Sequence, residues 1–254
     1  MSPVLFNIYT DDLSRKLSKL RTGCNLNGKC MNHLIYADDM VLLAPSPSAL
    51  QNLLNECEAY AVDNAIKYNE IKTVCMSVLP KWLKTVNVPK FTLNNVPLKT
   101  VCKQKYLGVI ISEEFTDDLD MDRQKKSIYC TGNMLIRRFQ SCSDSVKTLL
   151  FKTYCTNMYG CHLWAKYSKS SYSKLKVAYN CICRHLMKLS RYDSMSNFMV
   201  SSHIKTLPEI RRTYMYGFYT RLCSSDNSVI NTIFNSMSFQ KGAIFNEWLY
   251  KLFS

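Results

Sequence analysis

The sequence contains no long apolar run. It is 47% hydrophobic, enough for a folded core, yet it has no stretch of about 18 uninterrupted apolar residues, as a membrane-spanning helix would require. The N-terminus also lacks the basic and then apolar segments of a secretory leader. We therefore expect a protein of the nucleus or cytoplasm that is neither secreted nor bound to a membrane.

The twelve cysteines lack the paired Cys-x2-Cys spacing of ordinary zinc modules. In a chain of this length without a leader, we expect them to be reduced, with no disulfide and with most of them as small core residues. The sequence leaves open whether the densest group of Cys and His residues binds zinc, and it favours a role of these residues in core packing instead. That group consists of Cys155, Cys161, His162, Cys181, Cys183 and His185.

Acidic residues are scarce in the second half of the chain. Residues 121–254 contain 6 Asp and Glu against 20 Lys and Arg, whereas residues 1–120 contain 13 acidic and 13 basic residues. The net charge of +14 therefore arises entirely from the second half. This asymmetry indicates a polyanionic partner, first nucleic acid and second an anionic membrane surface, while a merely solvated basic surface is the alternative.

Two adjacent acids interrupt the apolar segment His33–Ala44. Asp38 and Asp39 are flanked by strand-forming residues, and aspartate is depleted from strand interiors but tolerated in turns. The segment therefore predicts a β-hairpin with both carboxylates in its turn. Neighbouring carboxylates in an apolar setting repel each other unless a hard cation such as Mg²⁺ neutralises them. A solvated acidic turn is the alternative, and these residues alone do not decide between the two.

Hydrophobic periodicity predicts the other elements. Apolar residues recur with helical spacing in segments 5–20, 50–66, 128–139, 146–154, 175–189 and 210–222. Strand-like segments occur at 72–78, 91–98 and 104–112. Ser48 is expected to cap the second helix, and Asn94-Asn95 to form a tight turn between two strands. Strands thus concentrate in the first half, and helices dominate the second.

Four motifs occur in a fixed order along the first half. They are Ser2-Pro3 with Leu5-Phe6-Asn7-Ile8-Tyr9 and Asp12-Leu13; Tyr36-Ala37-Asp38-Asp39 with Met40-Val41-Leu42-Leu43; Asn69 with Lys72-Thr73 and Met76; and Lys105-Tyr106-Leu107-Gly108-Val109. Together they resemble reverse transcriptases of LINE-type non-LTR retrotransposons, closely over residues 2–112 and more loosely beyond. The resemblance implies an α+β fold. A partial palm, an antiparallel sheet with helices, would span residues 1–112, and a basic, mainly helical thumb-like region residues 113–254.

The resemblance also implies a site for two-metal nucleotidyl transfer. Asp38 would ligate Mg²⁺ or Mn²⁺ directly, and Asp39 would assist it or orient the site. Lys72 would lie near the leaving pyrophosphate as a proton donor. The role of Lys72 rests wholly on the resemblance, because a lone lysine after a helix is ordinarily a surface residue.

Template–primer contacts follow from the same resemblance. Tyr36 would support the catalytic hairpin near the template–primer, and a second hairpin would position the 3′ end of the primer through Tyr106, Leu107 and Gly108. In the basic half, the residues expected to bind nucleic acid are Arg137, Arg138, Lys174, Arg184 and Lys188.

The chain begins after the segments that carry the fingers and a further metal-binding aspartate in this family. We therefore expect a fragment of an RNA-directed DNA polymerase that binds metal weakly and is inactive alone. Its expected partners are RNA and DNA and the missing upstream polymerase portion. The alternative is a non-enzymatic nucleic-acid-binding protein that uses the basic half, with the aspartate pair retained by descent.

Overall fold

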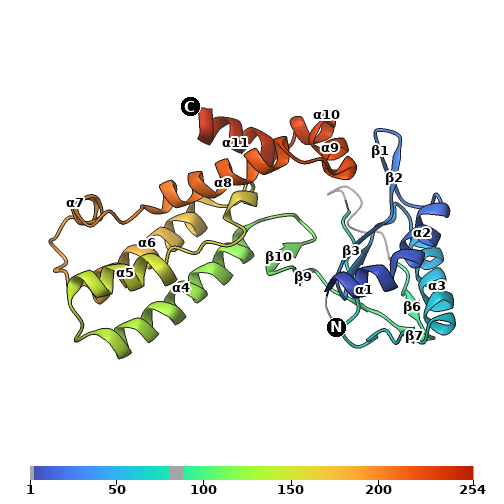
Figure 1. The fold of residues 1–254 in the computed structure, drawn as a ribbon, viewed down its shortest axis with the longest axis horizontal. Helices are drawn as coiled ribbons and strands as arrows, with labels where there is room; N and C mark the ends of the chain where they lie inside the picture. The colour runs from blue at the N-terminus through green and yellow to red at the C-terminus, as the bar shows by residue number, and fades with distance from the viewer. Residues whose placement is uncertain (1–2, 80–87, 254) are drawn as a thin grey trace. The chain divides into compact units, whose positions relative to one another are not determined.

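The computed structural model of the chain describes residues 3–79 and 88–253, so Ser2 of the first motif lies outside it. The chain forms two compact units, Met1–Cys102 and Lys103–Ser254. Helices and short strand pairs make up both units, which confirms the α+β class (Figure 1). None of the helices described here combines the length and the apolar character needed to cross a membrane.

Two of the helices in the first unit form a small core. The expected N-terminal helix is divided into α1 (Pro3–Tyr9) and α2 (Asp11–Lys19), with Thr10 between them. The next helix, α3 (Pro47–Asp63), is capped by Ser46, whose hydroxyl accepts from Ala49 N at 3.3 Å. The prediction of Ser48 as the cap is wrong, because Pro47 already occupies the first helical position. The core residues shared by α2 and α3 are Leu13, Leu17, Leu53, Cys57 and Tyr60.

The strands of the first unit form pairs only, among the residues that the structure describes. Their bounds are β1 (Cys24–Leu26), β2 (Lys29–Met31), β3 (His33–Tyr36), β4 (Asp39–Leu42), β5 (Val74–Cys75), β6 (Thr92–Leu93), β7 (Val96–Pro97) and β8 (Lys99–Thr100). The pairs β1–β2, β3–β4 and β6–β7 are antiparallel, whereas β5 and β8 are parallel. Asn94 and Asn95 form the predicted turn, with φ of 50° and 60°.

The second unit begins with a hairpin and continues as helices. Its elements are β9 (Lys103–Tyr106), β10 (Val109–Ser112), α4 (Asp118–Phe139), α5 (Asp144–Tyr154), α6 (Lys169–Leu186), α7 (Met195–Ser201), α8 (Leu207–Cys223), α9 (Ser228–Phe234), α10 (Met237–Gln240) and α11 (Ala243–Phe253). The sequence predicted α4, α5, α6 and α8 and missed the other four helices. The hairpin 103–112, which the sequence assigned to the first domain, belongs by its contacts to this unit. The domain assignment itself stays a prediction.

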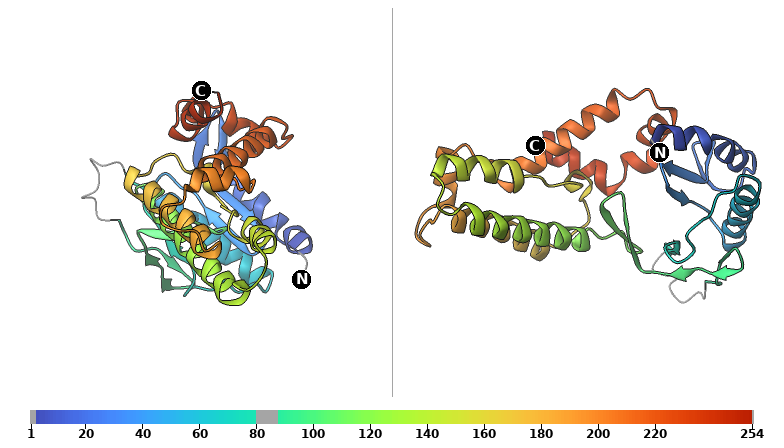
Figure 2. Two further views of the ribbon diagram at one scale, coloured as in Figure 1. Left: turned by 90° about the vertical axis from the view of Figure 1, so that its left-hand side faces the viewer. Right: turned by 60° about the horizontal axis from the view of Figure 1, so that its bottom comes forward.

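Helices α4 and α6 pack closely against each other (Figures 1 and 2). Gly132 lies at the closest approach, where a Cβ atom would come within 2.2 Å of Ile182 Cγ2. Only glycine therefore fits at this position of α4. The surrounding core includes Leu135, Phe151, Leu175 and Tyr179, and its residues come from helices α4 to α8 and from the segments that connect them.

The cysteines differ in part from expectation. All twelve are free thiols in the structure, but the expectation that most are core residues is wrong, because only five are buried. The buried thiols are Cys57, Cys75, Cys155, Cys161 and Cys183. The other seven lie at positions that face solvent wholly or in part, including Cys130 on α4 and Cys181 on α6.

Arg211 of α8 connects several segments of the second unit. Its side chain is 4% exposed and forms an ion pair with Glu247 of α11, Nη1 to Oε1 3.0 Å. Nη1 also donates to the hydroxyl of Tyr167 at 2.6 Å, while Nη2 donates to the carbonyl of Trp164. The Tyr167 hydroxyl in turn donates to Glu247 Oε1 at 3.2 Å. A buried guanidinium with this many acceptors fixes the position of α11 against α8.

Candidate metal and nucleic-acid sites

The aspartate pair lies at the tip of the β3–β4 hairpin. The register pairs Tyr36 with Asp39, so the two turn residues are Ala37 and Asp38. The predicted turn of Asp38-Asp39 is therefore one residue too late, because Asp39 is already the first residue of β4. Ala37 has φ of 51°, a conformation that costs a non-glycine residue about 1 kcal/mol. Both carboxylates and the Tyr36 ring are exposed to solvent.

The base of this hairpin is attached to α2. Asn32, which is 2% exposed, donates from Nδ2 to Leu17 O at 2.6 Å and accepts from Leu43 N at 2.8 Å. His33 Nδ1 lies 2.7 Å from Asn32 Oδ1, and Nε2 lies 2.7 Å from Ser14 Oγ. An amide oxygen only accepts, so Nδ1 carries a proton and donates this bond. Burial lowers the pKa of His33, which favours the neutral ring. The tip is thus solvated while the base is fixed.

Two adjacent, exposed carboxylates provide oxygen ligands for one hydrated divalent ion. Mg²⁺ accepts one or two carboxylates and keeps its remaining waters, so this donor set is compatible with weak binding. Within residues 3–79 and 88–253, no group of three or more His, Cys, Asp or Glu side chains is arranged to hold a metal ion. The assignment of Asp38 and Asp39 as metal ligands stays a prediction.

Lys72 lies in a turn that Asn69 organises. Lys72 N donates to Asn69 O at 3.1 Å and to Asn69 Oδ1 at 3.0 Å. The hydroxyl of Thr73 donates to the same carbonyl at 2.8 Å, and β5 follows directly. The motif Asn69-x-x-Lys72-Thr73 is therefore a local turn that leaves the Lys72 side chain exposed. Its catalytic role stays a prediction.

The β9–β10 hairpin turns at Leu107 and Gly108. Tyr106 pairs with Val109, and the two turn residues have φ of 44° and 83°. A Cβ atom on Gly108 would come within 3.0 Å of Tyr159 Cε1, so both the backbone conformation and the neighbouring ring favour glycine here. Leu107 is 37% exposed, and the Tyr106 side chain is partly buried.

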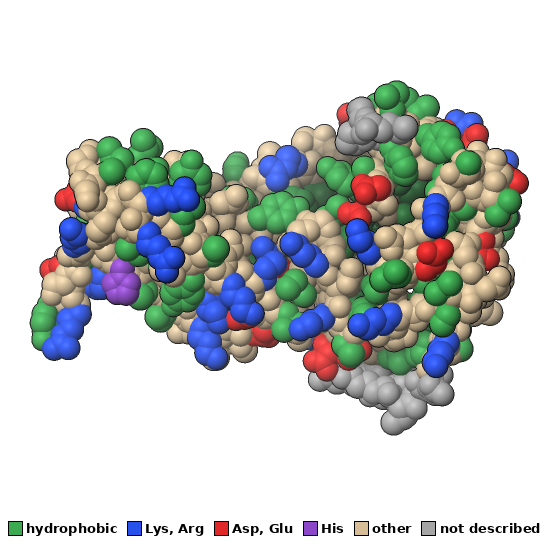
Figure 3. All heavy atoms as spheres, turned by 90° about the horizontal axis from the view of Figure 1, so that it is seen from below, with side chains coloured by type: hydrophobic (Ala, Val, Ile, Leu, Met, Phe, Trp, Pro, Cys, Tyr) green, Lys and Arg blue, Asp and Glu red, His purple; other side chains and the backbone are tan. Residues whose placement is uncertain are grey.

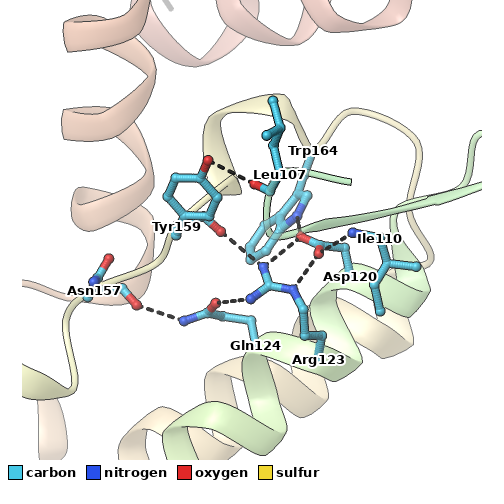
Figure 4. Close-up of polar contacts among 8 residues, drawn as sticks. All are labelled: Leu107, Ile110, Asp120, Arg123, Gln124, Asn157, Tyr159 and Trp164. Atoms are coloured by element: carbon cyan, nitrogen blue, oxygen red, sulfur yellow. Dashed lines mark hydrogen bonds and ion pairs between the residues drawn. The ribbon is translucent and has the colours of Figure 1, made fainter. Parts of the chain in front are cut away.

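A buried carboxylate connects this hairpin to α4 (Figure 4). Asp120 is 1% exposed, and its Oδ1 accepts from Ile110 N at 3.0 Å. Arg123 donates to both of its oxygens, from Nε at 2.6 Å and from Nη2 at 3.1 Å. Trp164 Nε1 donates to Oδ2 at 2.9 Å. Four donors, two of them from a guanidinium, compensate the burial of this charge.

The same arginine holds the loop that carries Tyr159. Arg123 Nη2 donates to Tyr159 O at 3.1 Å, and Gln124 Nε2 donates to Asn157 O at 2.7 Å. The Tyr159 hydroxyl donates to Leu107 O at 3.0 Å. We call the residues of Figure 4 the Asp120 network: Leu107, Ile110, Asp120, Arg123, Gln124, Asn157, Tyr159 and Trp164.

The sequence analysis missed the Asp120 network. Asp120 lies outside the segments that the sequence analysis predicted as helices and strands, and its partners Ile110 and Trp164 lie 10 and 44 residues away in the chain. The i, i+3 spacing of Asp120 and Arg123 on a helix was the one local signal. That spacing is common on solvated helix faces and does not identify the other partners.

The five basic residues expected to bind nucleic acid lie in different environments. Arg137 and Arg138 are exposed in the last turn of α4, and Lys174 is exposed on α6. Lys188 is exposed just after α6, whereas Arg184 is half-buried and donates to the carbonyls of Ser190 and Asp193. Arg184 therefore supports the chain after α6. On the face shown in Figure 3, Lys and Arg side chains are scattered and do not form one patch.

Comparisons with known proteins identify relatives of the first half. The family described as reverse transcriptase (RNA-dependent DNA polymerase) matches residues 1–111. The chain is 31% identical over 117 residues to the retrovirus-related Pol polyprotein from type-1 retrotransposable element R2 of Nasonia vitripennis, over 43% of this chain and 11% of that protein. It is 30% identical over 118 residues to the corresponding R2 polyprotein of Popillia japonica, over 44% of this chain and 20% of that protein. The chain thus spans a fifth or less of these curated relatives.

Proposed function

We propose that this chain, whose residues 1–111 match the reverse transcriptase family and resemble R2 retrotransposon polyproteins, is part of an RNA-directed DNA polymerase of a non-LTR retrotransposon. In this proposal, the first unit contributes the Asp38-Asp39 hairpin to the polymerase site, and the second unit binds template and primer. The match of the family over the hairpin, together with the exposed carboxylates at its tip, is the observation that carries the proposal.

Asp38 and Asp39 are the residues that would hold the divalent ion, Mg²⁺ or Mn²⁺. The bound ion lowers the pKa of an attacking hydroxyl and stabilises charge on the transferred phosphate. The protein supplies a hairpin whose base is fixed by Asn32 and His33, so that the two carboxylates are presented at a defined place on the first unit. Tyr36, opposite Asp39 in the register, stands beside them as the proposed support for the template–primer.

We expect weak metal binding at this tip. NMR of the chain titrated with Mg²⁺, and then with Mn²⁺ as a paramagnetic probe, should perturb residues 36–40 with a dissociation constant of about 1 mM or weaker, because few protein ligands replace water. The Asp38→Asn, Asp39→Asn variant should abolish the perturbation. An Asp11→Asn, Asp12→Asn variant of the exposed acids on α2 is the matched control. Undiminished perturbation at the tip of the first variant would refute the assignment.

We expect the chain to bind RNA and DNA with little sequence preference and with strong dependence on salt. Each phosphate contact that releases a counterion contributes about −0.9 to the log–log slope on duplexes. Changing Arg137, Arg138 and Lys174 to glutamine should weaken binding and reduce the slope by about 2 to 3. Fluorescence anisotropy at several salt concentrations measures both quantities.

The matched control removes the same charge from the first unit. Arg15, Lys16 and Lys19 of α2 are exposed, and their change to glutamine should leave the slope nearly unaltered. Equal effects of the two triple variants would mean that net charge alone, and not the second unit, drives binding. A slope near zero in the unaltered chain would remove nucleic acid as the partner.

The second candidate function is nucleic-acid binding without catalysis. The observation that favours it is the charge of residues 121–254, with 20 basic and 6 acidic residues. Both candidates predict the salt dependence above, and only primer extension separates them.

A further inference from the structure

The β9–β10 hairpin is not part of a larger sheet in the portion of the chain that the structure describes. Its two strands pair only with each other among the described residues, and an isolated two-stranded hairpin is marginally stable in water. The position of its turn must therefore come from contacts outside the hairpin. The structure provides two such contacts on opposite parts of it. Asp120 accepts from Ile110 N on β10, and Tyr159 donates to Leu107 O in the turn.

These two contacts belong to one closed set of bonds. Arg123 pairs with Asp120 and also donates to Tyr159 O, so the loop residue that holds the turn is itself held by the partner of the buried carboxylate. The bonds link Asp120 to Arg123, Arg123 to Tyr159, and Tyr159 to Leu107 in the turn. The hairpin backbone then connects Leu107 to Ile110, which donates to Asp120 and closes the set. Closed networks of this kind restrict each member more than separate bonds do, because a displacement at one bond strains the others.

Tyr159 is exposed although it makes these contacts. Its side chain is 50% exposed, while its hydroxyl and one ring edge lie against Leu107 and Gly108. A tyrosine that served only to fill the core would be buried. Here the ring fits the space left by the missing side chain of Gly108, and its hydroxyl satisfies a turn carbonyl that faces solvent.

We propose that Tyr159 is a positioning residue for the Tyr106-Leu107-Gly108 turn, acting together with Asp120, and that it fixes the orientation in which the turn meets the end of a nucleic-acid strand. The inference rests on the proposed function for the contact between turn and primer, and it adds residues that the four sequence motifs do not contain. Asp120 on α4 and Tyr159 in the loop 155–160 thus determine where the turn lies. Nucleic acid that binds the turn is therefore positioned relative to α4 and this loop.

The test uses the full chain and a variant that removes one oxygen atom. Tyr159→Phe keeps the ring against Gly108 and deletes the bond to Leu107 O. Because Tyr159 is 50% exposed, the substitution leaves the core of the unit unaltered. Tyr154→Phe, at a 53% exposed tyrosine of α5 outside the Asp120 network, is the matched control. Hydrogen exchange of residues 103–112 should become about fivefold faster in Tyr159→Phe and stay unchanged in Tyr154→Phe.

The second measurement is photocrosslinking of a primer–template whose primer ends in 4-thiothymidine. The unaltered chain should crosslink at residues 106–108, and Tyr159→Phe should lower that yield severalfold while the overall dissociation constant changes less than twofold. A merely structural role of Tyr159 would leave the distribution of crosslinks unaltered. Unchanged exchange, or unchanged crosslinking at the turn, in Tyr159→Phe overturns the inference.

Crosslinking of the unaltered chain tests the proposed function, and comparison with Tyr159→Phe tests the positioning role of Tyr159. If the unaltered chain forms no crosslink at residues 103–112, the proposed contact between turn and primer is wrong, and the inference falls with it. If the unaltered chain crosslinks there and Tyr159→Phe behaves like Tyr154→Phe, the proposed function stands and Tyr159 has no positioning role.

Discussion

Replacing Arg211 by methionine is expected to lower the free energy of unfolding of the second unit by about 3 to 5 kcal/mol, because removing one partner of a buried ion pair leaves the other charge uncompensated. Glu247, whose side chain is 19% exposed, would lose its cation, and the Tyr167 hydroxyl would lose a donor. The carbonyls of Cys161 and Trp164 would also lose the guanidinium. Methionine fills part of the same volume, so the effect reports mainly the lost polar contacts.

Urea denaturation followed by circular dichroism measures this change. The expected result is a fall in the transition midpoint with little change in the m-value, since the surface exposed on unfolding stays similar. Arg212→Met is the matched control, because Arg212 is the next residue of α8 and is exposed. We expect less than about 0.5 kcal/mol for this surface change. Equal destabilisation by both variants would show that Arg211 does not organise the unit.

A polypeptide of residues 1–254 is expected to yield no detectable primer extension on an annealed RNA–DNA primer–template with Mg²⁺ and four deoxynucleotides. Two-metal phosphoryl transfer needs carboxylates that hold both ions and groups that align the incoming triphosphate. The tip of the β3–β4 hairpin offers the exposed pair Asp38-Asp39, and the described residues contain no cluster of three or more metal-binding side chains. Loss of one member of a catalytic unit can abolish nearly all of its rate enhancement.

The measurement is gel electrophoresis of labelled primer, with a reverse transcriptase known to be active as the positive control. A second reaction adds a separately produced segment containing fingers and a further palm aspartate from a related polymerase. Extension only in the second reaction, and its loss in Asp38→Asn, would support the polymerase proposal. Extension by the 254-residue polypeptide alone, abolished by Asp38→Asn, would show that the remaining ligands come from within it.

The local signals of the sequence predicted the local structure well. Asn94-Asn95 forms the expected turn because asparagine accepts positive φ. The helix expected over 210–222 is α8, which begins at Leu207 with a capping box from Thr206 and Glu209. The β3–β4 hairpin was predicted with its turn one residue late. Alternation of apolar residues fixes the faces of a strand, but the exact register is decided by pairing across the hairpin, here Tyr36 with Asp39.

Contacts distant in sequence could not be predicted in the same way. Nothing near Arg211 indicates Glu247, which lies 36 residues later on a helix that the sequence analysis missed. Likewise, Asp120 meets Trp164 only because α4 and the segment before α6 fold back on each other. The division of the chain after Cys102 follows from such contacts too, since the motif order suggested a boundary ten residues later. Spacing within a motif carries no information on these partners.

The Asp120 network also bears on how the helical part of this protein can be produced separately. An expression boundary placed after residue 112, where the motifs end, would separate Ile110 and Leu107 from Asp120 and Tyr159. In the shortened polypeptide, Asp120 would lack its amide donor Ile110 N, and the Tyr159 hydroxyl would lack its acceptor Leu107 O. A boundary between Cys102 and Lys103 keeps every bond of the network in one polypeptide. A polypeptide designed to contain the second unit should therefore begin with the β9–β10 hairpin.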